Sequence, residues 1–206
     1  LCLASVADQG VRHEHLVQDA GSDDGTLDWL PQDPRVWAWV EPDRGMYDAV
    51  NRGYRRAAAG IVSYLNCDEQ YLPGALRRVL DFFQQHPEVD ILFGDCLVVD
   101  ATGGYLCERR ALTPQLIHTW TASNLAFLTA ATFLRRRVLE SHQLWFNADF
   151  RAAGDQDWAL RLIQAGAKTA VLPDFLSVFT ETGKNLGLDG NTIRERRAFH
   201  ATAPAW

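Results

Sequence analysis

Apolar segments of strand length alternate with amphipathic segments of helix length through the first half of this 206-residue chain. The pattern predicts strands at 15–18, 35–40 and 61–65, and helices at 22–30, 46–59 and 73–85. Such alternation is typical of an α/β fold with a mostly parallel central sheet and helices on both faces. The length suits one sizeable core, so we predict a single domain.

The second half of the chain has a more mixed pattern. It predicts strands at 90–99, 168–172 and 175–179, a turn at Gly103-Gly104 and a helix at 155–165 that Gly166 closes. Residues 125–134 are apolar enough for a buried strand, and a helix is the competing interpretation. The Arg135-Arg136-Arg137 run indicates a solvated helix start, with contact to anionic lipid headgroups as a minority interpretation.

Composition excludes several classes of protein. The 20 basic and 26 acidic residues give a net charge of −6, which argues against a nucleic-acid partner. With 47% hydrophobic residues the chain is too apolar to be disordered, and it has no apolar run of about 18 residues to span a membrane. The four cysteines have no paired C-x-x-C spacing, so we expect reduced thiols rather than a zinc site.

Three acidic clusters fall where a strand ends or a helix begins. Residues 19–26 follow the first predicted strand, residues 66–69 follow the third, and residues 154–158 open a helix. In open parallel sheets ligands bind beyond the carboxyl ends of strands. The clusters therefore suggest a ligand hydrogen-bonded to Asp19, a divalent cation on the carboxylate pair Asp68 and Glu69, and a general base in the 154–158 cluster.

Each cluster also has an ordinary structural interpretation, as a capped turn, a solvated acidic turn and a helix N-cap, respectively. The polar, glycine-punctuated segment 41–53 favours the functional one. On its predicted helix Asp48 and Asn51 lie three residues apart and share a face, while Arg44 precedes the helix and can reach a phosphate.

In their order, these segments resemble the family 2 inverting glycosyltransferases, in the bacterial branch that builds exopolysaccharide, capsule or O-antigen repeat units. The segments are D-A-G-S-D-D-G-T (19–26), E-P-D-R-G-M-Y-D-A-V-N-R-G (41–53), Y-L-N-C-D-E (64–69) and G-D-Q-D-W-A-L-R-L (154–162). The resemblance covers roughly residues 1–180. It implies a GT-A fold, an α/β sandwich that holds a nucleotide-diphospho-sugar and a divalent metal, Mn²⁺ or Mg²⁺.

The resemblance also implies roles for single residues. Asp155 matches the catalytic aspartate, Asp68 the metal ligand, and Asp19 the residue that contacts the nucleotide base. The positions that match the nucleotide-sugar pocket are Asp43, Arg44, Asp48, Asn51 and Asn66. The acceptor is then the hydroxyl of a glycan or of a lipid-linked saccharide.

Several positions depart from the family pattern. Residues 1–9 resemble the helix that follows the family's first strand, so we expect that strand to be missing from this N-terminally truncated domain. Asn66 and Glu69 replace aspartates, Gly154 replaces a glutamate, and residues 128–131 differ from the usual acceptor stretch. Trp158 and Lys184 are possible contacts to the acceptor or a phosphate, although core packing and a solvated loop, respectively, are favoured.

The resemblance divides the domain into a nucleotide-sugar-binding half at 1–100, an acceptor and catalytic half at 101–190 and a C-terminal tail at 191–206. It implies a cytoplasmic protein, with peripheral contact to the inner face of the membrane as an option. Two other functions remain open: a non-catalytic nucleotide- or carbohydrate-binding relative or inactive fragment, and, more weakly, a nucleotidyltransferase. The sequence leaves the oligomeric state and the roles of Glu69 and Asp157 unassigned.

Overall fold

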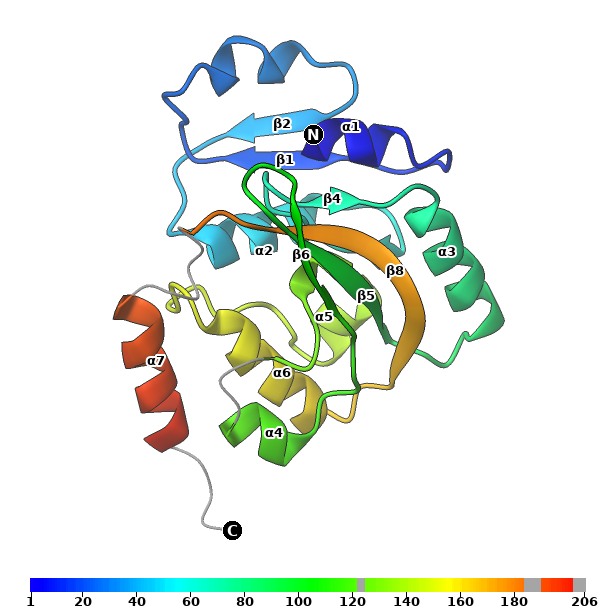
Figure 1. Ribbon diagram of the computed structural model, residues 1–206, viewed down its shortest axis with the longest axis vertical. Helices are drawn as coiled ribbons and strands as arrows, with labels where there is room; N and C mark the ends of the chain where they lie inside the picture. The colour runs from blue at the N-terminus through cyan, green and yellow to red at the C-terminus, as the bar shows by residue number, and fades with distance from the viewer. Residues whose placement is uncertain (122–124, 184–189, 202–206) are drawn as a thin grey trace.

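The computed structural model describes residues 1–121, 125–183 and 190–201 and contains two sheets, a larger one at the centre and a smaller one toward one end (Figure 1). In the smaller sheet β1 (Leu16–Asp19) pairs in parallel with β2 (Trp37–Val40). The larger sheet has the order β3-β7-β5-β8-β4, with β6 paired to β5. Its strands are β3 (Ile61–Val62), β4 (Gln70–Tyr71), β5 (Ile91–Asp100), β6 (Tyr105–Arg109), β7 (Thr132–Arg135) and β8 (Thr169–Glu181).

The strand pairing is mixed, whereas the sequence predicted a mostly parallel sheet. Among the strands of the described residues, β1–β2 and β5–β8 are parallel, and the other four pairings are antiparallel. The β5–β6 pair shows the reason, because a short turn through Gly103 joins the two strands and a parallel pair needs a long crossover. Among the described strands β1 does not pair with β3, so the two sheets stay separate.

One continuous strand replaces the two short strands predicted around Pro173. The pairing between β5 and β8 passes from Gly94 with Leu172 to Asp95 with Phe175, so Pro173 and Asp174 lie in a bulge. Proline has no N–H to donate to a ladder, and a bulge allows the strand to continue past it.

Helices cover both faces of the larger sheet, as predicted. On one face lie α2 (Met46–Arg56), α5 (Arg137–Ser141) and α6 (Gly154–Gln164), whose buried side chains pack on Ile91 and Phe93. On the other lie α1 (Cys2–Ala7) and α3 (Ala75–Gln85), packed on Leu92 and Phe133. Neighbouring residues of β5 therefore serve opposite cores, as the two-residue period of a strand requires.

Three segments differ from the sequence expectations. Residues 22–30 form no α-helix. Left-handed Gly25 leads instead into two 3₁₀ turns, η1 (Thr26–Asp28) and η2 (Leu30–Gln32). Residues 125–134 hold η3 (Thr129–Ala131) and the start of β7. The expected tail contains helix α7 (Gly190–Ala201), while α4 (Leu116–Thr121) was not predicted. Within the described residues, every helix is too short or too polar to cross a bilayer.

The basic run at 135–137 is only in part the solvated helix start that the sequence suggests. Arg137 opens α5 with a mostly exposed side chain. Arg135 ends β7 and donates hydrogen bonds to the carbonyl oxygens of Val89 (2.8 Å), Phe83 (2.8 Å) and His86 (3.2 Å). Its guanidinium thus satisfies carbonyl groups at the C-terminal end of α3, which a helix leaves without partners.

We expect Arg135→Ala to lower the free energy of unfolding by about 2 to 4 kcal/mol, because several charge-assisted hydrogen bonds are lost together. The matched control is Arg137→Ala, whose side chain is 62% exposed and makes one long contact with Asp90. It should cost less than about 1 kcal/mol. Urea unfolding of both variants measures the difference, and equal losses would contradict the structural role of Arg135.

Candidate functional site

The N-terminal end of α2 and the segment that leads into α6 meet, and this junction joins two of the predicted site segments. The hydroxyl of Tyr47 donates to the carbonyl of Ala152 (3.2 Å) and accepts from the N–H of Asp155 (3.2 Å). The guanidinium of Arg151 donates to the carbonyl of Arg44. These contacts link residues 44–47 to the start of α6, so Asp155 lies beside the 43–51 segment.

Asp155 sits in the first turn of α6 and is partly buried. Its Oδ1 accepts the N–H of Gln156 at 2.8 Å, and its Oδ2 accepts no hydrogen bond from the described residues. Burial raises the pKa of this carboxyl to about 6, although the Gln156 N–H and the positive charge of Arg196 lower it in part. A carboxylate with an open oxygen and a raised pKa can accept a proton near neutral pH.

The residues before and within α2 form a charged group. Asp43 accepts the N–H of Gly45 at 2.8 Å, and Asp48 accepts the N–H of Arg44 at 3.1 Å and the guanidinium of Arg52 at 2.9 Å. Burial raises the pKa of Asp48, but these two donors outweigh it, and the pKa lies below its usual range. Arg44 is 65% exposed and stands 3.8 Å from Asp149, so its guanidinium can still meet an anion.

Asn51, predicted to line the nucleotide-sugar pocket, is buried and uses both ends of its amide inside the protein. Its Nδ2 donates to the carbonyl of Phe146 (2.7 Å), and its Oδ1 accepts the N–H of the same residue (2.9 Å). The side chain therefore holds the backbone before α6 in place. This geometry favours a structural role for Asn51, in which it positions the backbone at Phe146, over direct contact with a ligand.

Asp19 lies at the end of β1, where the sequence placed it. Its carboxylate accepts the N–H groups of Gly21 (2.8 Å) and Ser22 (2.7 Å) and the hydroxyl of Ser22 (2.8 Å). Its slight burial raises the pKa, but these hydrogen bonds outweigh it and keep the pKa of Asp19 below its usual range. The carboxylate is therefore ionised and already shapes its own turn.

Asn66 and Asp68 lie on the loop between β3 and β4. The N–H and the Nδ2 of Asn66 donate to Glu69, at 2.8 and 3.2 Å, and Glu69 is only 1% exposed. Burial raises the pKa of Glu69 to about 7. Glu69 thus supports the loop from inside, while the carboxylate of Asp68 accepts no hydrogen bond from the described residues.

This loop can contribute one open carboxylate to a cation. The described residues contain no group of three or more His, Cys, Asp or Glu side chains gathered as a metal site. A hard cation such as Mg²⁺ is commonly held by one or two carboxylates together with substrate phosphates. Asp68 therefore fits a cation that a diphosphate helps to bind, and no described hydrogen bond or ion pair joins it to Asp155.

Two further predicted residues, Trp158 and Asp157, lie on α6. Trp158 is 1% exposed and belongs to the core, as the sequence favoured, and Asp157 orients Arg161 at 2.9 Å. Lys184 lies outside the described residues. Within 128–131 both alanines, Ala130 and Ala131, are buried, so this stretch contributes packing. Sequence reasoning missed the role of Tyr47, although the residue stands inside the 41–53 segment that it singled out.

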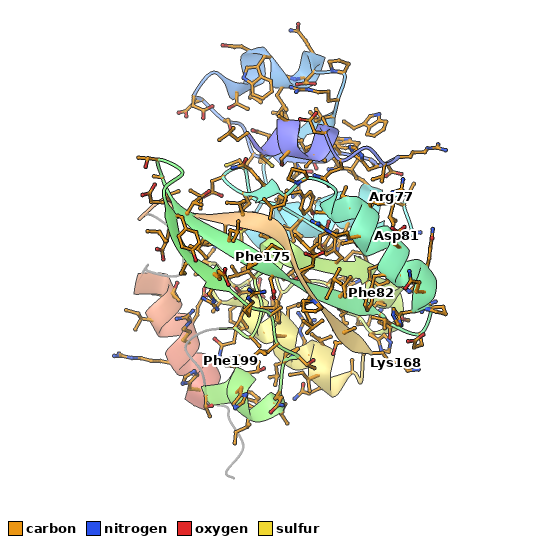
Figure 2. The ribbon with its side chains drawn as sticks, turned by 45° about the vertical axis from the view of Figure 1, so that its right-hand side comes forward. Arg77, Asp81, Phe82, Lys168, Phe175 and Phe199 are labelled. Carbon is orange, nitrogen blue, oxygen red and sulfur yellow. The ribbon has the colours of Figure 1, made fainter. Side chains whose placement is uncertain are left out.

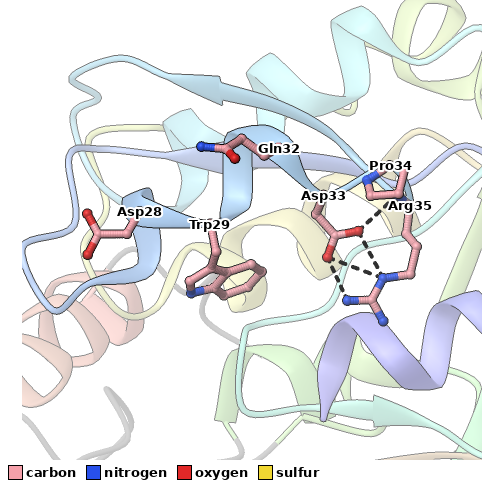
Figure 3. A pocket seen from close by; sticks show the side chains of 6 residues that line it. All are labelled: Asp28, Trp29, Gln32, Asp33, Pro34 and Arg35. Atoms are coloured by element: carbon pink, nitrogen blue, oxygen red, sulfur yellow. Dashed lines mark hydrogen bonds and ion pairs between the residues drawn. The ribbon is translucent and has the colours of Figure 1, made fainter.

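Two surface hollows lie away from Asp155. Figure 3 shows the first, about 360 Å³, lined by Asp28, Trp29, Gln32, Asp33, Pro34 and Arg35. Its charged pair is satisfied internally, because Arg35 donates to Asp33 at 2.6 Å. The second, about 640 Å³, is lined by residues that include Trp37, Trp39 and Arg56. None of the predicted site residues lines either hollow. The candidate site residues lie at the α2–α6 junction, at the end of β1 and on the loop between β3 and β4.

Comparison with solved structures defines the class of fold. The chain superposes on *S. aureus* TarS 1–349 in complex with UDP-GlcNAc with a TM-score of 0.72 and 16% identity, covering all of this chain and 63% of that one. TarS 1–349 in complex with UDP gives 0.68 at 17% identity, over 97% of this chain and 59% of that one. The expected α/β glycosyltransferase fold is thereby confirmed, and the chain spans less than two thirds of these structures.

Residues 1–142 match the family model described as glycosyl transferase family 2, and the chain belongs to this family. It is 26% identical to a PGL/p-HBAD biosynthesis glycosyltransferase of *Mycobacterium tuberculosis*, over 95% of this chain and 75% of that protein. It is 22% identical to the amylovoran biosynthesis glycosyltransferase AmsE of *Erwinia amylovora*, over 72% and 55%. The predicted family and the assignment as a glycosyltransferase are confirmed.

The glycine that replaces a glutamate before Asp155 has a steric reason. A Cβ at Gly154 would lie 2.6 Å from Cε2 of Tyr47, closer than real Cβ contacts. We expect Gly154→Ala to lower the free energy of unfolding by about 1 to 3 kcal/mol, because the Tyr47 ring must move. Gly53→Ala in α2 meets nothing within 4 Å and should be neutral or stabilising by up to about 1 kcal/mol.

Chemical denaturation of the two variants makes the comparison within one protein. A Gly154→Ala variant as stable as the wild type would show that the Tyr47 contact does not constrain this position.

Proposed function

We propose that the domain transfers a sugar, with inversion, from a nucleotide-diphospho-sugar to a hydroxyl of a glycan or lipid-linked saccharide, assisted by a divalent cation. The observation that carries this proposal is Asp155, a carboxylate with one open oxygen and a raised pKa beside the arginine-bearing start of α2. The TarS structures hold UDP and UDP-GlcNAc, which supports a nucleotide-sugar donor. The relatives are named for biosynthesis, which supports a biosynthetic role.

The reaction is a single displacement. Asp155 accepts the proton of the acceptor hydroxyl, whose oxygen forms a bond to the anomeric carbon while the bond from that carbon to the diphosphate oxygen breaks. The electron pair leaves with the nucleoside diphosphate. A cation held by Asp68 and the phosphates would offset the negative charge that develops there. No second carboxylate nucleophile is needed, in contrast to a retaining glycosidase.

The other residues would bind and orient. Asp19 would meet the nucleotide base, and Arg44, with Asp43 and Asp48 shaping its turn, would face the donor phosphates. Asn66 would hold the Asp68 loop through Glu69. In this proposal residues 1–100 serve the donor, and residues 101–190 supply the base. A non-catalytic relative would bind the nucleotide without transfer.

We expect Asp155→Asn to reduce transfer by about 10² to 10⁴-fold, because the amide cannot accept the proton. The assay measures sugar transfer and hydrolysis with a panel of UDP-, GDP- and dTDP-sugars and Mn²⁺. In the wild type kcat/KM should fall about tenfold per pH unit below pH 6, where Asp155 becomes protonated. The matched control is Asp157→Asn on the same helix, which should keep transfer because the Asp157 carboxylate orients Arg161 and is not the proposed base. Full activity in Asp155→Asn would refute the base.

Stability supplies a readout that needs no substrate. The folded chain holds the proton of Asp155 more tightly than the unfolded chain, with pKa values of about 6 and 3.8, so ionisation destabilises the fold as pH rises through this window. Above pH 7 Asp155→Asn should therefore be more stable than the wild type by roughly 2 to 3 kcal/mol, and the difference should vanish below about pH 3.

For the cation, we expect Asp68→Ala to abolish the dependence of UDP binding on Mn²⁺ in calorimetry, because the protein's open carboxylate is lost. Asp81→Ala on α3, which replaces an aspartate outside the proposed site, should keep it (Figure 2). Unchanged Mn²⁺ dependence in Asp68→Ala would contradict the proposed ligand, and binding without any transfer by the wild type would favour the non-catalytic relative.

A further inference from the structure

Helix α7 packs beside the helices that frame the candidate base. The ring of Phe199 in α7 lies 4.5 Å from the ring of Trp120 in α4, tilted against it by 33°, and Phe199 shares a buried cluster with Leu160 of α6 (Figures 1 and 2). Glu195 lies four residues before Phe199 and therefore on the same face of the helix. The cluster thus directs Glu195 toward the segment that precedes α6.

The carboxylate of Glu195 binds three consecutive backbone N–H groups in that segment. Its Oε1 accepts from Arg151 (2.8 Å), and its Oε2 accepts from Ala152 (3.0 Å) and Ala153 (2.9 Å). Ala153 is the N-cap of α6 and has no side-chain cap of its own. A carboxylate from a distant helix thus takes the place of a local cap, at the end of α6 where the helix dipole favours negative charge.

The same short segment is also bound by a side chain of α2. Tyr47 binds the carbonyl of Ala152 and the N–H of Asp155, both at 3.2 Å. Glu195 and Tyr47 together bind the N–H groups of residues 151–153 and the carbonyl of Ala152. Both side chains come from helices far away in the sequence. Asp155 follows two residues after Ala153, the last residue that Glu195 binds. The direction of the Asp155 side chain therefore depends on the position of this segment.

We propose that Glu195 is a positioning residue for Asp155, which holds the 151–153 backbone so that the open oxygen of Asp155 faces the acceptor hydroxyl. The proposal rests on the proposed function, because it gives Glu195 a role only if Asp155 is the base. Misplacing a catalytic group by about 1 Å can cost about 10²-fold in rate. Glu195 would then raise kcat without touching donor or acceptor.

The charge of Glu195 also acts on the pKa of Asp155. The groups that face Asp155 are Glu195 and Arg196 from α7, Tyr47 from α2, Tyr64 from the segment after β3, and the N–H of Gln156 on its own helix. The negative charge of Glu195 raises the pKa of Asp155 and the positive charge of Arg196 lowers it. Neutralising Glu195 should therefore lower the pKa of Asp155 and move the acidic limb of the pH profile to lower pH.

The experiment compares Glu195→Ala and Glu195→Gln with the wild type in the full-length protein. Glu195→Ala should reduce kcat by about 10- to 100-fold with KM for the donor changed by less than about twofold. Glu195→Gln keeps one accepting oxygen, so its kcat should fall between those of Glu195→Ala and the wild type. The matched control is Glu140→Gln on α5, whose side chain is 71% exposed, and it should leave kcat unchanged.

Two measurements by nuclear magnetic resonance need no substrate. Amide exchange at Ala152 and Ala153 should accelerate in Glu195→Ala, and the carboxyl carbon of Asp155 should titrate at lower pH in Glu195→Gln than in the wild type. In an Asp155→Asn background, Glu195→Ala should cause no further loss of the residual rate, because the residue acts through Asp155.

The outcomes separate the two proposals. If the wild type transfers sugar and Asp155→Asn does not, yet Glu195→Ala keeps kcat within about twofold, the positioning role is wrong and the proposed function stands. If exchange and titration change as expected while the wild type transfers no sugar from any donor of the panel, the proposed function fails, and with it the catalytic meaning of the contact. An unfolded Glu195→Ala leaves Glu195→Gln to decide, since an unshifted titration there overturns the proposal.

Discussion

The site depends on the junction between α2 and the segment 146–155, where side chains of α2 bind backbone groups 95 to 108 residues further along the chain. Tyr47 and Asn51 lie four residues apart on one face of α2, and both are buried. Tyr47 binds Ala152 and Asp155, and Asn51 binds both backbone groups of Phe146. Burial strengthens these hydrogen bonds and makes their loss costly, so the segment has one well-defined position.

The same helix also connects the two sheets. Arg56 binds Gln18 of β1 and Glu41 just after β2, while Arg52 binds Glu41 and Asp48. β1 and β3 do not pair, and these ion pairs and hydrogen bonds join the smaller sheet to the body of the domain. The acidic balance of the chain is thus used in part for internal pairing with arginine, in addition to the carboxylates left open at the site.

Local signals in the sequence predicted much of the fold, and contacts between distant residues explain the rest. The apolar spacing of α2, α3 and α6 and the strand period of β5 are local, so their positions followed from the sequence. Pairing direction depends on which strands meet, and mixed pairing was not predicted. Arg135 looked like a solvated cation because its three carbonyl partners lie 46 to 52 residues away.

The candidate site shows the same division. Asp19 ends β1, Asp68 lies on the loop between β3 and β4, and Asp155 lies in the first turn of α6. The local pattern and the family resemblance singled out all three as candidates. The partner of the segment before Asp155 is Glu195, in a stretch that the sequence marked only as a tail, and a separation of 42 to 44 residues leaves no periodic trace. Every residue other than proline has the same backbone N–H and carbonyl groups. The sequence therefore does not mark which of them will bind a distant side chain.

Hydrogen-bond occupancy distinguishes motif residues that can meet a ligand from those that support the fold. Asn51 has both ends of its amide bound to Phe146, and Glu69 has both oxygens bound to Asn66. By contrast, the side-chain carboxylate of Asp68 and one oxygen of Asp155 accept no hydrogen bond from the described residues. An amide whose donor and acceptor are both bound, as in Asn51, gains little from a ligand, whereas an open carboxylate can still take a proton or a cation. Motif matching treats the two kinds alike, and their contacts in the folded chain separate them.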